Sequence, residues 1–165
     1  KMREAGFGRI VNVGSSGGEF TTPGGGVYQA TKYALTSMND AMRPELKQFG
    51  IDVTMIQPGA IASKFASNGA VLGLDSNPYQ QLMLGINKIT SEAVKAGAMG
   101  TWSPEDIANV IFKAGTTKKP RARYRPGIVA KSLIYMRLLL PYRVWDKMYM
   151  SSMMSLGQKE MKKNK

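Results

Sequence analysis

Two short segments rich in β-branched residues flank one long helical segment, and this order constrains the fold more than any other feature. Residues 8–14 contain an Ile-Val-Asn-Val run, and residues 51–56 form a second apolar run. Both runs predict buried strands. Residues 28–49 predict the helix between them. A strand, a long helix and a second strand form a βαβ unit, whose strands pair in parallel through a right-handed crossover. The sequence therefore predicts an α/β fold with a parallel sheet.

The predicted helix over residues 28–49 has a recognisable face and end. Gly50 is a plausible stop for it. Pro44 lies late in the segment, so we expect a kink or an early end there. Residues at helical spacing form an apolar stripe of the kind that packs on a core. These residues are Ala30, Ala34, Met38, Ala41 and Met42.

The rest of the chain predicts further helices and one short strand. Residues 60–100 are weakly patterned, with a helix around residues 79–96, and loops of this length are usually functional lids or mobile segments. Ser103 and the proline and acids that follow it predict a helix start. That helix is expected to run to about Ala114. A short strand is expected at residues 122–124.

We predict two parts without an internal repeat. Residues 1–130 form part of a Rossmann-like α/β domain, and residues 131–165 form a helical, basic tail with six of the twelve methionines. The tail could lie on a membrane or close over an apolar pocket. Packing on the domain or in a subunit contact is the favoured alternative. Residues 1–5 are expected to form the last turn of a helix and lack the apolar region of a signal peptide.

Composition excludes several kinds of chemistry. The 165 residues include no cysteine and no histidine, which excludes disulfides, thiol nucleophiles and Ser-His-Asp catalysis. Most zinc sites are excluded as well, and we predict no metal site. The net charge of +12 favours anions such as a phosphorylated cofactor, a membrane surface or nucleic acid, although a solvated basic surface explains it equally well. The sequence contains no run of about 18 apolar residues, so we predict no membrane-spanning helix.

Three side chains form a candidate site for proton transfer. Tyr28 and Lys32 are four residues apart, on one face of a helix. A cation close to a phenol favours the phenolate, which makes the phenol a usable general acid/base. Ser15 follows the first strand, where its hydroxyl can hold a substrate oxygen. Ligands bind such sheets beyond the carboxyl ends of the strands. Because Ser15 and the Pro58–Gly59 pair both follow a strand, we expect them to meet at one edge.

These segments resemble the classical short-chain dehydrogenase/reductase family. The family patterns are Asn-x-Ser-Ser, Tyr-x-x-x-Lys and Pro-Gly-x-Val/Ile-x-Thr. They are matched in order by residues 12–16, 28–32 and 58–63. One such motif alone would be weak, but three in order on a βαβ unit are specific. The resemblance covers about residues 1–127 and implies a doubly wound, Rossmann-like parallel sheet and a nicotinamide-dependent oxidoreductase.

The resemblance assigns catalytic roles residue by residue. Tyr28 would be the general acid/base for the substrate oxygen. Lys32 would stabilise the phenolate of Tyr28 and hydrogen-bond the nicotinamide ribose. Ser15 would be the catalytic serine, thirteen residues before the tyrosine, with Ser16 as the fallback. Gly14 replaces the family's first, non-catalytic serine.

The resemblance also implies cofactor-binding residues. Pro58, Gly59 and Ile61 would line the nicotinamide, together with Tyr28 and Lys32 from the catalytic set. Ser63 stands where the family has threonine, and its hydroxyl could make the same bond or simply cap a following helix.

One departure from the family pattern is large. The glycine-rich phosphate loop, the ribose-selecting residue and the catalytic asparagine precede the region that this sequence matches. The run at residues 23–26 is not a substitute, because it precedes the catalytic helix. We therefore expect the C-terminal portion of a longer enzyme, inactive and weak in dinucleotide binding by itself. Three arginines, at positions 121, 123 and 125, resemble a phosphate patch but are expected to form a solvated edge.

The sequence leaves two hypotheses of function. The first is an oxidoreductase that transfers a hydride between NAD(P)(H), with NADP(H) slightly favoured, and a carbonyl/secondary alcohol pair. Its substrate would be apolar, such as a steroid, retinoid or lipid-derived ketone. A homodimer or tetramer with the helix from Tyr28 as a subunit contact, in the cytoplasm, is implied. The second is a non-catalytic basic module whose tail binds a membrane surface or a partner protein. No nucleic-acid-binding signature is present.

Overall fold

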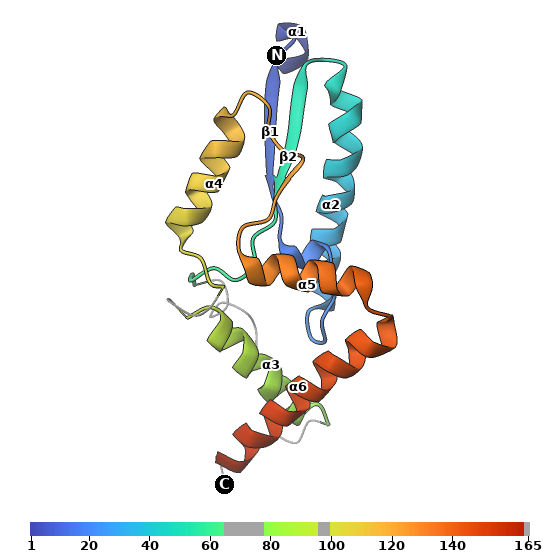
Figure 1. The fold of residues 1–165 in the computed structure, drawn as a ribbon, viewed down its shortest axis with the longest axis vertical. Helices are drawn as coiled ribbons and strands as arrows, with labels where there is room; N and C mark the ends of the chain where they lie inside the picture. The colour runs from blue at the N-terminus through green and yellow to red at the C-terminus, as the bar shows by residue number, and fades with distance from the viewer. Residues whose placement is uncertain (65–77, 96–99, 164–165) are drawn as a thin grey trace.

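A computed structural model of the chain describes residues 1–64, 78–95 and 100–163. Some of its helices lie beside a narrow parallel sheet and the others lie beyond one end of it (Figure 1). In chain order the elements are α1 (Met2–Ala5), β1 (Gly8–Val13), the 3₁₀ helix η1 (Ser16–Gly18), α2 (Gly26–Lys47), β2 (Ile51–Ile56), α3 (Gln80–Ala93), α4 (Pro104–Thr116), β3 (Arg123–Tyr124), α5 (Ile128–Leu139) and α6 (Tyr142–Lys163).

The sheet has the strand order β1-β2-β3, and both pairings are parallel. Gly8 pairs with Ile51 and Val13 with Ile56, so β1 and β2 end at the same level. Helices α2 and α4 flank the strands on opposite sides (Figure 1). As a result β2 is buried along nearly its whole length, and Met55 and Ile56 are completely inaccessible to solvent. The predicted βαβ unit and its parallel pairing are confirmed.

The other predicted elements are also present, with small shifts in their ends. Helix α4 begins where the sequence predicts, because Ser103 and Asp106 form a reciprocal capping box. The Ser103 hydroxyl accepts a hydrogen bond from the Asp106 N–H at 3.1 Å, and the Asp106 carboxylate accepts one from the Ser103 N–H at 3.2 Å. The short strand forms at Arg123–Tyr124 and pairs with the end of β2. Helix α3 occupies most of the predicted range.

The prediction for the buried face of α2 is wrong. Its buried side chains are the polar residues Gln29, Thr36 and Asn39. Gln29 is hydrogen-bonded to Thr22 of the loop before α2, and the Asn39 side-chain oxygen accepts from Asn12 of β1. The Thr36 hydroxyl donates to the Lys32 carbonyl of its own helix at 2.9 Å. Buried polar groups are tolerated when they are hydrogen-bonded in this way. Four of the five stripe residues, Ala30, Ala34, Met38 and Ala41, face outward instead and are exposed.

Pro44 does not end α2, which continues to Lys47. The outward stripe and the neighbouring Val27, 87% exposed, give this helix an uncovered apolar face. The predicted homodimer or tetramer with α2 as subunit contact stays a prediction, and this face is where it would form.

The tail is helical, as predicted, and consists of α5 and α6 (Figure 1). Trp145 of α6 is buried against Phe20 and Ile134, with its ring edge-on to Phe20 at 5.7 Å. Its Nε1–H donates to the Thr21 carbonyl at 3.1 Å, so the tail is anchored to the loop after η1. The predicted boundary between residues 130 and 131 lies inside α5, and the division into two parts stays a prediction.

Helices α3 and α6 cross with their backbones almost in contact (Figure 1). A Cβ atom at Gly157 would lie 1.8 Å from the carbonyl oxygen of Gln81, and one at Gly85 would lie 1.9 Å from that of Met153. Only glycine permits this approach. The tail therefore packs on the domain through α3, which is the alternative that the sequence favours.

Among residues 1–64, 78–95 and 100–163, no helix is both long enough and apolar enough to cross a membrane.

Candidate active site

The three candidate catalytic side chains line one pocket of about 460 Å³ at the carboxyl edge of the sheet. Ser15 comes from the turn after β1, and Tyr28 and Lys32 come from the first turns of α2. The segment after β2 supplies Pro58, Gly59, Ile61 and Ser63 to the same pocket. All seven predicted site residues therefore meet, because β1 and β2 end at the same level.

The Ser15 hydroxyl is oriented by the backbone. Ser15 is the N-cap of η1, and its Oγ accepts a hydrogen bond from the Gly17 N–H at 3.0 Å. This bond uses a lone pair of the oxygen, so the hydroxyl hydrogen can be donated to a ligand. Ser16 is buried, and its N–H donates to the Pro58 carbonyl at 2.8 Å. Ser15 lines the pocket and Ser16 does not.

Glycines bring Ser15 close to Tyr28. A Cβ atom at Gly17 would lie 3.5 Å from Ser15 Oγ and 3.4 Å from Cε1 of Tyr28, so both groups approach one point. One at Gly18 would lie 2.7 Å from the Lys32 carbonyl oxygen, too close for any larger residue. The turn after β1 can therefore rest directly on α2 beside Tyr28.

Lys32 lies over the aromatic ring of Tyr28. Its Nζ is 5.5 Å from the ring centroid, within the range of a cation–π interaction. Tyr28 is 38% exposed and Lys32 is partly buried, so a molecule in the pocket can reach both.

The segment that follows β2 is held by residues further along the chain. Ile61 forms a parallel bridge with Trp102, and the Ala62 N–H donates to the Trp102 carbonyl at 2.9 Å. Gly59 lies against α5, where a Cβ atom would be only 2.9 Å from that of Ala130. These contacts fix the backbone that forms one side of the pocket.

The wall opposite this segment comes from α3 and was not among the predicted site residues. Ile89, Thr90, Ala93 and Val94 line the pocket. Their spacing places them on one helix face, which is the signal that the sequence offered. Nothing local showed that this face would meet Tyr28, because the contact depends on the packing of α3 against α6.

A second and larger cavity, of about 860 Å³, lies between residues 21–23, Tyr33 and the corner that joins α5 to α6. It is lined by none of the predicted site residues. Its size does not make it the better candidate, because the proton-transfer groups Ser15, Tyr28 and Lys32 lie in the smaller pocket.

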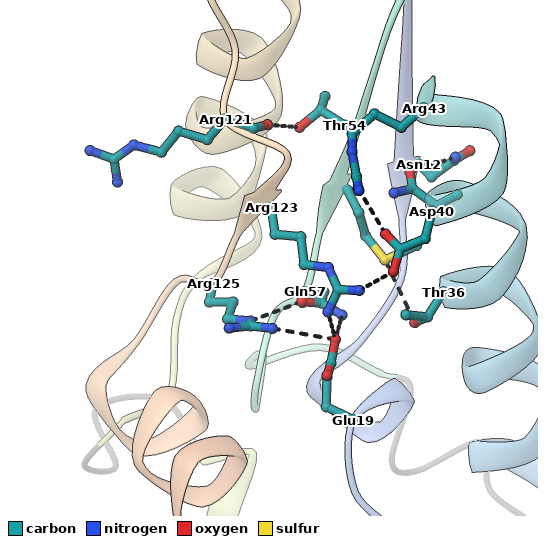
Figure 2. Close-up of polar contacts among 12 residues, drawn as sticks. Asn12, Glu19, Thr36, Asp40, Arg43, Thr54, Gln57, Arg121, Arg123 and Arg125 are labelled. Carbon is teal, nitrogen blue, oxygen red and sulfur yellow. Dashed lines mark hydrogen bonds and ion pairs between the residues drawn. The ribbon is translucent and has the colours of Figure 1, made fainter. Parts of the chain in front are cut away.

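Five charged and polar side chains form what we call the Glu19–Arg123 cluster (Figure 2). Its members are Glu19, Asp40, Gln57, Arg123 and Arg125. The two guanidinium nitrogens of Arg123 donate separately to Glu19 and to Asp40. Gln57, fully buried, donates to Glu19 at 2.6 Å and accepts from Arg125 at 3.0 Å.

The expected solvated edge is therefore wrong for Arg123 and Arg125, whose charges are paired inside the protein. Arg121 is exposed and extends away from the cluster (Figure 2). Burial opposes ionisation of Asp40, but the hydrogen bonds and charges of Arg123 and Arg43 outweigh it and hold the pKa of Asp40 below its usual value. The sequence alone could not show that Arg123 and Arg125 form ion pairs while Arg121 is exposed, because the three arginines look alike in the sequence.

The sequence of this chain is similar to those of known proteins. The profile of the family described as "short chain dehydrogenase" matches residues 1–70. The uncharacterized oxidoreductase YbbO of Escherichia coli K12 is 35% identical over 150 residues, which cover 88% of this chain and 49% of YbbO. The NADPH-dependent 3-dehydrocapnine reductase of Ornithobacterium rhinotracheale is 30% identical over 158 residues, covering 92% of this chain and 53% of the reductase.

A solved structure agrees with these relatives. The crystal structure of a short-chain dehydrogenase from Streptomyces avermitilis superposes with a TM-score of 0.67 at 30% identity, over 83% of this chain and 48% of that protein. The parallel sheet flanked by helices, with the site at its carboxyl edge, is part of a Rossmann-like fold. The chain belongs to the short-chain dehydrogenase/reductase family. It spans about half the length of the curated relatives that it matches.

Proposed function

We propose that this chain carries the proton-transfer site of an oxidoreductase that moves a hydride between NAD(P)(H) and a carbonyl/secondary alcohol pair. The observation that carries the proposal is the meeting of Ser15, Tyr28 and Lys32 in one pocket. The relatives that are named as oxidoreductases and as an NADPH-dependent reductase support it.

The chain's own residues handle the substrate oxygen. In the direction of reduction, the Ser15 hydroxyl donates a hydrogen bond to the carbonyl oxygen and orients it. Tyr28 donates its phenolic proton to that oxygen as negative charge develops there, and the O–H bond of the phenol breaks. Lys32 stabilises the phenolate that remains. In the direction of oxidation, the phenolate of Tyr28 accepts the hydroxyl proton of the alcohol.

The residues of the pocket fit the nicotinamide end of the cofactor. When bound, NAD(P)(H) supplies or accepts the hydride. Pro58, Gly59 and Ile61 offer an apolar surface with close backbone approach, as a flat aromatic amide requires. Ser63 and Lys32 add a hydroxyl and an ammonium for polar groups. The sequence contains no G-x-G-x-x-G turn between a strand and a helix, so the grip on the pyrophosphate is not among these residues.

The proposed substrate is an apolar ketone or the matching alcohol, and NADP(H) is the proposed cofactor. The α3 wall supports an apolar substrate, since Ile89, Ala93 and Val94 leave few polar groups there. The charge of +12 and the NADPH dependence of the O. rhinotracheale relative support the phosphorylated cofactor.

The test replaces Tyr28 with phenylalanine in the full-length protein. Loss of the acid/base should lower turnover of NADPH with an apolar ketone by about 10²- to 10⁴-fold, while NADPH binding measured by calorimetry is retained. Tyr33→Phe is the matched control, because it makes the same change on the same helix but outside the pocket. Turnover that survives Tyr28→Phe would refute the role of Tyr28.

We also propose a second role for the tail, contact with an anionic lipid surface. The corner between α5 and α6 exposes Leu138 (68%), Leu139 (83%) and Tyr142 (73%). Arg143 and Lys147, in the first turns of α6, are exposed as well, with Asp146 between them. Apolar residues flanked by cations are typical of peripheral membrane contacts. Such a contact would not replace the chemistry of the catalytic pocket, which is not lined by Leu138, Leu139 or Tyr142.

A further inference from the structure

The Glu19–Arg123 cluster joins the separate chain segments that carry the site. Glu19 is the C-cap of η1, whose N-cap is Ser15. Asp40 lies on α2, the helix of Tyr28 and Lys32. Arg123 on β3 binds both carboxylates, and so connects the turn of Ser15 to the helix of Tyr28 (Figure 2).

The same cluster reaches the third segment of the site. Gln57 directly precedes Pro58, and its side chain is enclosed between Glu19 and Arg125. Arg125 also approaches Glu19, at 3.4 Å. The turn of Ser15, helix α2 and the segment after β2 are therefore all joined to one hydrogen-bonded cluster.

Arg123 adds a second connection between the turn of Ser15 and α2, besides the Thr22–Gln29 hydrogen bonds in the loop that follows the turn. Gly17 and Gly18 have no side chains, so η1 rests on α2 without interlocking. Backbone hydrogen bonds tie the turn to the end of β2 and to the segment after it: Gly14 donates to Ile56 and Ser16 donates to Pro58, both at 2.8 Å. The link between the turn and α2 that involves charged side chains is the bridge through Arg123.

The chemistry of Arg123 suits a rigid bridge. Its planar guanidinium presents separate nitrogens to two carboxylates at once, which a lysine ammonium cannot reproduce in the same geometry. The side chains of Arg123 and Glu19 are only 23% and 14% exposed, so water screens their interaction weakly. Removing the arginine would leave two carboxylates without their shared partner.

We propose that Arg123 is a positioning residue for the reaction proposed above: by holding Glu19 and Asp40 together it sets the distance between the Ser15 hydroxyl and the Tyr28 phenol. This inference rests on the proposed function of that site. A displacement of about 1 Å at a reacting group can lower turnover about 10²-fold. Arg123 therefore acts on kcat, through Ser15, without touching the substrate.

The first experiment compares Arg123→Met with Arg121→Met in the full-length protein. Arg123→Met should lower kcat by about 10- to 100-fold, because Ser15 and Tyr28 lose their fixed spacing. KM should change by less than about 3-fold, since the binding surfaces remain. Arg121→Met makes the same chemical change at an exposed position two residues away and should leave both constants unchanged. Equal kinetics for the two variants would overturn the inference.

The second experiment is a double-mutant cycle with Ser15→Ala. If Arg123 acts through Ser15, Arg123→Met should lower kcat less than about 3-fold when the hydroxyl is already absent. The same loss in both backgrounds would show a general structural role and refute positioning. If Arg123→Met does not fold, Arg123→Lys and Glu19→Gln keep most of the cluster and decide the question in the same cycle.

Tyr28→Phe, assayed in parallel, separates the two proposals. Full turnover by Tyr28→Phe refutes the proposed function itself. Loss of turnover by Tyr28→Phe, combined with additive effects of Arg123→Met and Ser15→Ala, refutes only the positioning role.

Discussion

The crossing of α3 and α6 gives a sharp prediction about the stability of this protein. Gly157 lies where the two backbones approach most closely, and a Cβ atom there would be 1.8 Å from the Gln81 carbonyl oxygen. Replacing Gly157 with alanine must therefore move one helix away from the other. The neighbouring atom belongs to a helix backbone, so no side-chain rotation can relieve the clash.

The size of the effect follows from the geometry. Real Cβ contacts below 3.0 Å are essentially absent, so the 1.8 Å contact requires a separation of at least 1.2 Å. Overpacking of this kind costs about 1–3 kcal/mol. Separation also stretches the hydrogen bond from Gln81 to the Met154 carbonyl, 2.9 Å long, which is worth about 1 kcal/mol. The better helix propensity of alanine offsets up to about 1 kcal/mol.

The net destabilisation is therefore about 2 kcal/mol, which corresponds to a decrease in Tm of about 3 °C for a full-length protein about twice as long as this chain, because the entropy of unfolding scales with length. The assay is thermal unfolding of the full-length protein followed by circular dichroism. Gly115→Ala in α4 is the matched control, because nothing lies within 4 Å of the Cβ position there. Its Tm should stay the same or rise, since alanine favours a helix.

A Gly157→Ala protein with a Tm equal to that of Gly115→Ala would refute the close crossing. Such a result would also contradict the idea that packing against α6 positions α3. The position of the pocket wall formed by Ile89 and Ala93 would then need another explanation.

Two further predictions concern the tail and the Glu19–Arg123 cluster. The full-length protein should sediment with vesicles that contain phosphatidylserine, and the double variant Leu138→Asp, Leu139→Asp should not. If the double variant still binds the vesicles, the corner between α5 and α6 is not the lipid contact. Asp40→Asn should lower the urea midpoint near neutral pH, because Arg123 and Arg43 hold the pKa of Asp40 below its usual value. That stabilisation is present above about pH 4 and is lost as the pH falls through the lowered pKa, so the two proteins should converge in acid.

Much of the fold could be predicted because its signals are local. The β-branched runs before and after a long helix are sufficient for a parallel βαβ unit, and the crossover in such a unit is almost always right-handed. The capping box at Ser103 fixes the start of α4 within a few residues of sequence. The two-residue strand at Arg123 was also expected, although its partner β2 lies far away in the chain.

The candidate site could be predicted where it depends on strand ends. Ser15 and Pro58 each follow a strand, and parallel strands in register end together. Tyr28 and Lys32 share a helix face by spacing alone. The α3 wall could not be predicted, because the position of Ala93 depends on how a distant helix, α6, packs against α3.

The sequence by itself determined the βαβ unit and the residues that meet at its edge, because hydrophobic period, chain direction and motif spacing act over a few residues. The tertiary structure alone decided which face of α2 is buried. An apolar stripe shows that a helix has two sides but not what covers each one. Here Thr22 and Asn12 offer polar partners to Gln29 and Asn39, and Thr36 bonds to the Lys32 carbonyl of its own helix, so these three residues face inward and the stripe faces out. The ion pairs of Arg123 were decided in the same way, because only folding brings the carboxylates of Glu19 and Asp40 close to it.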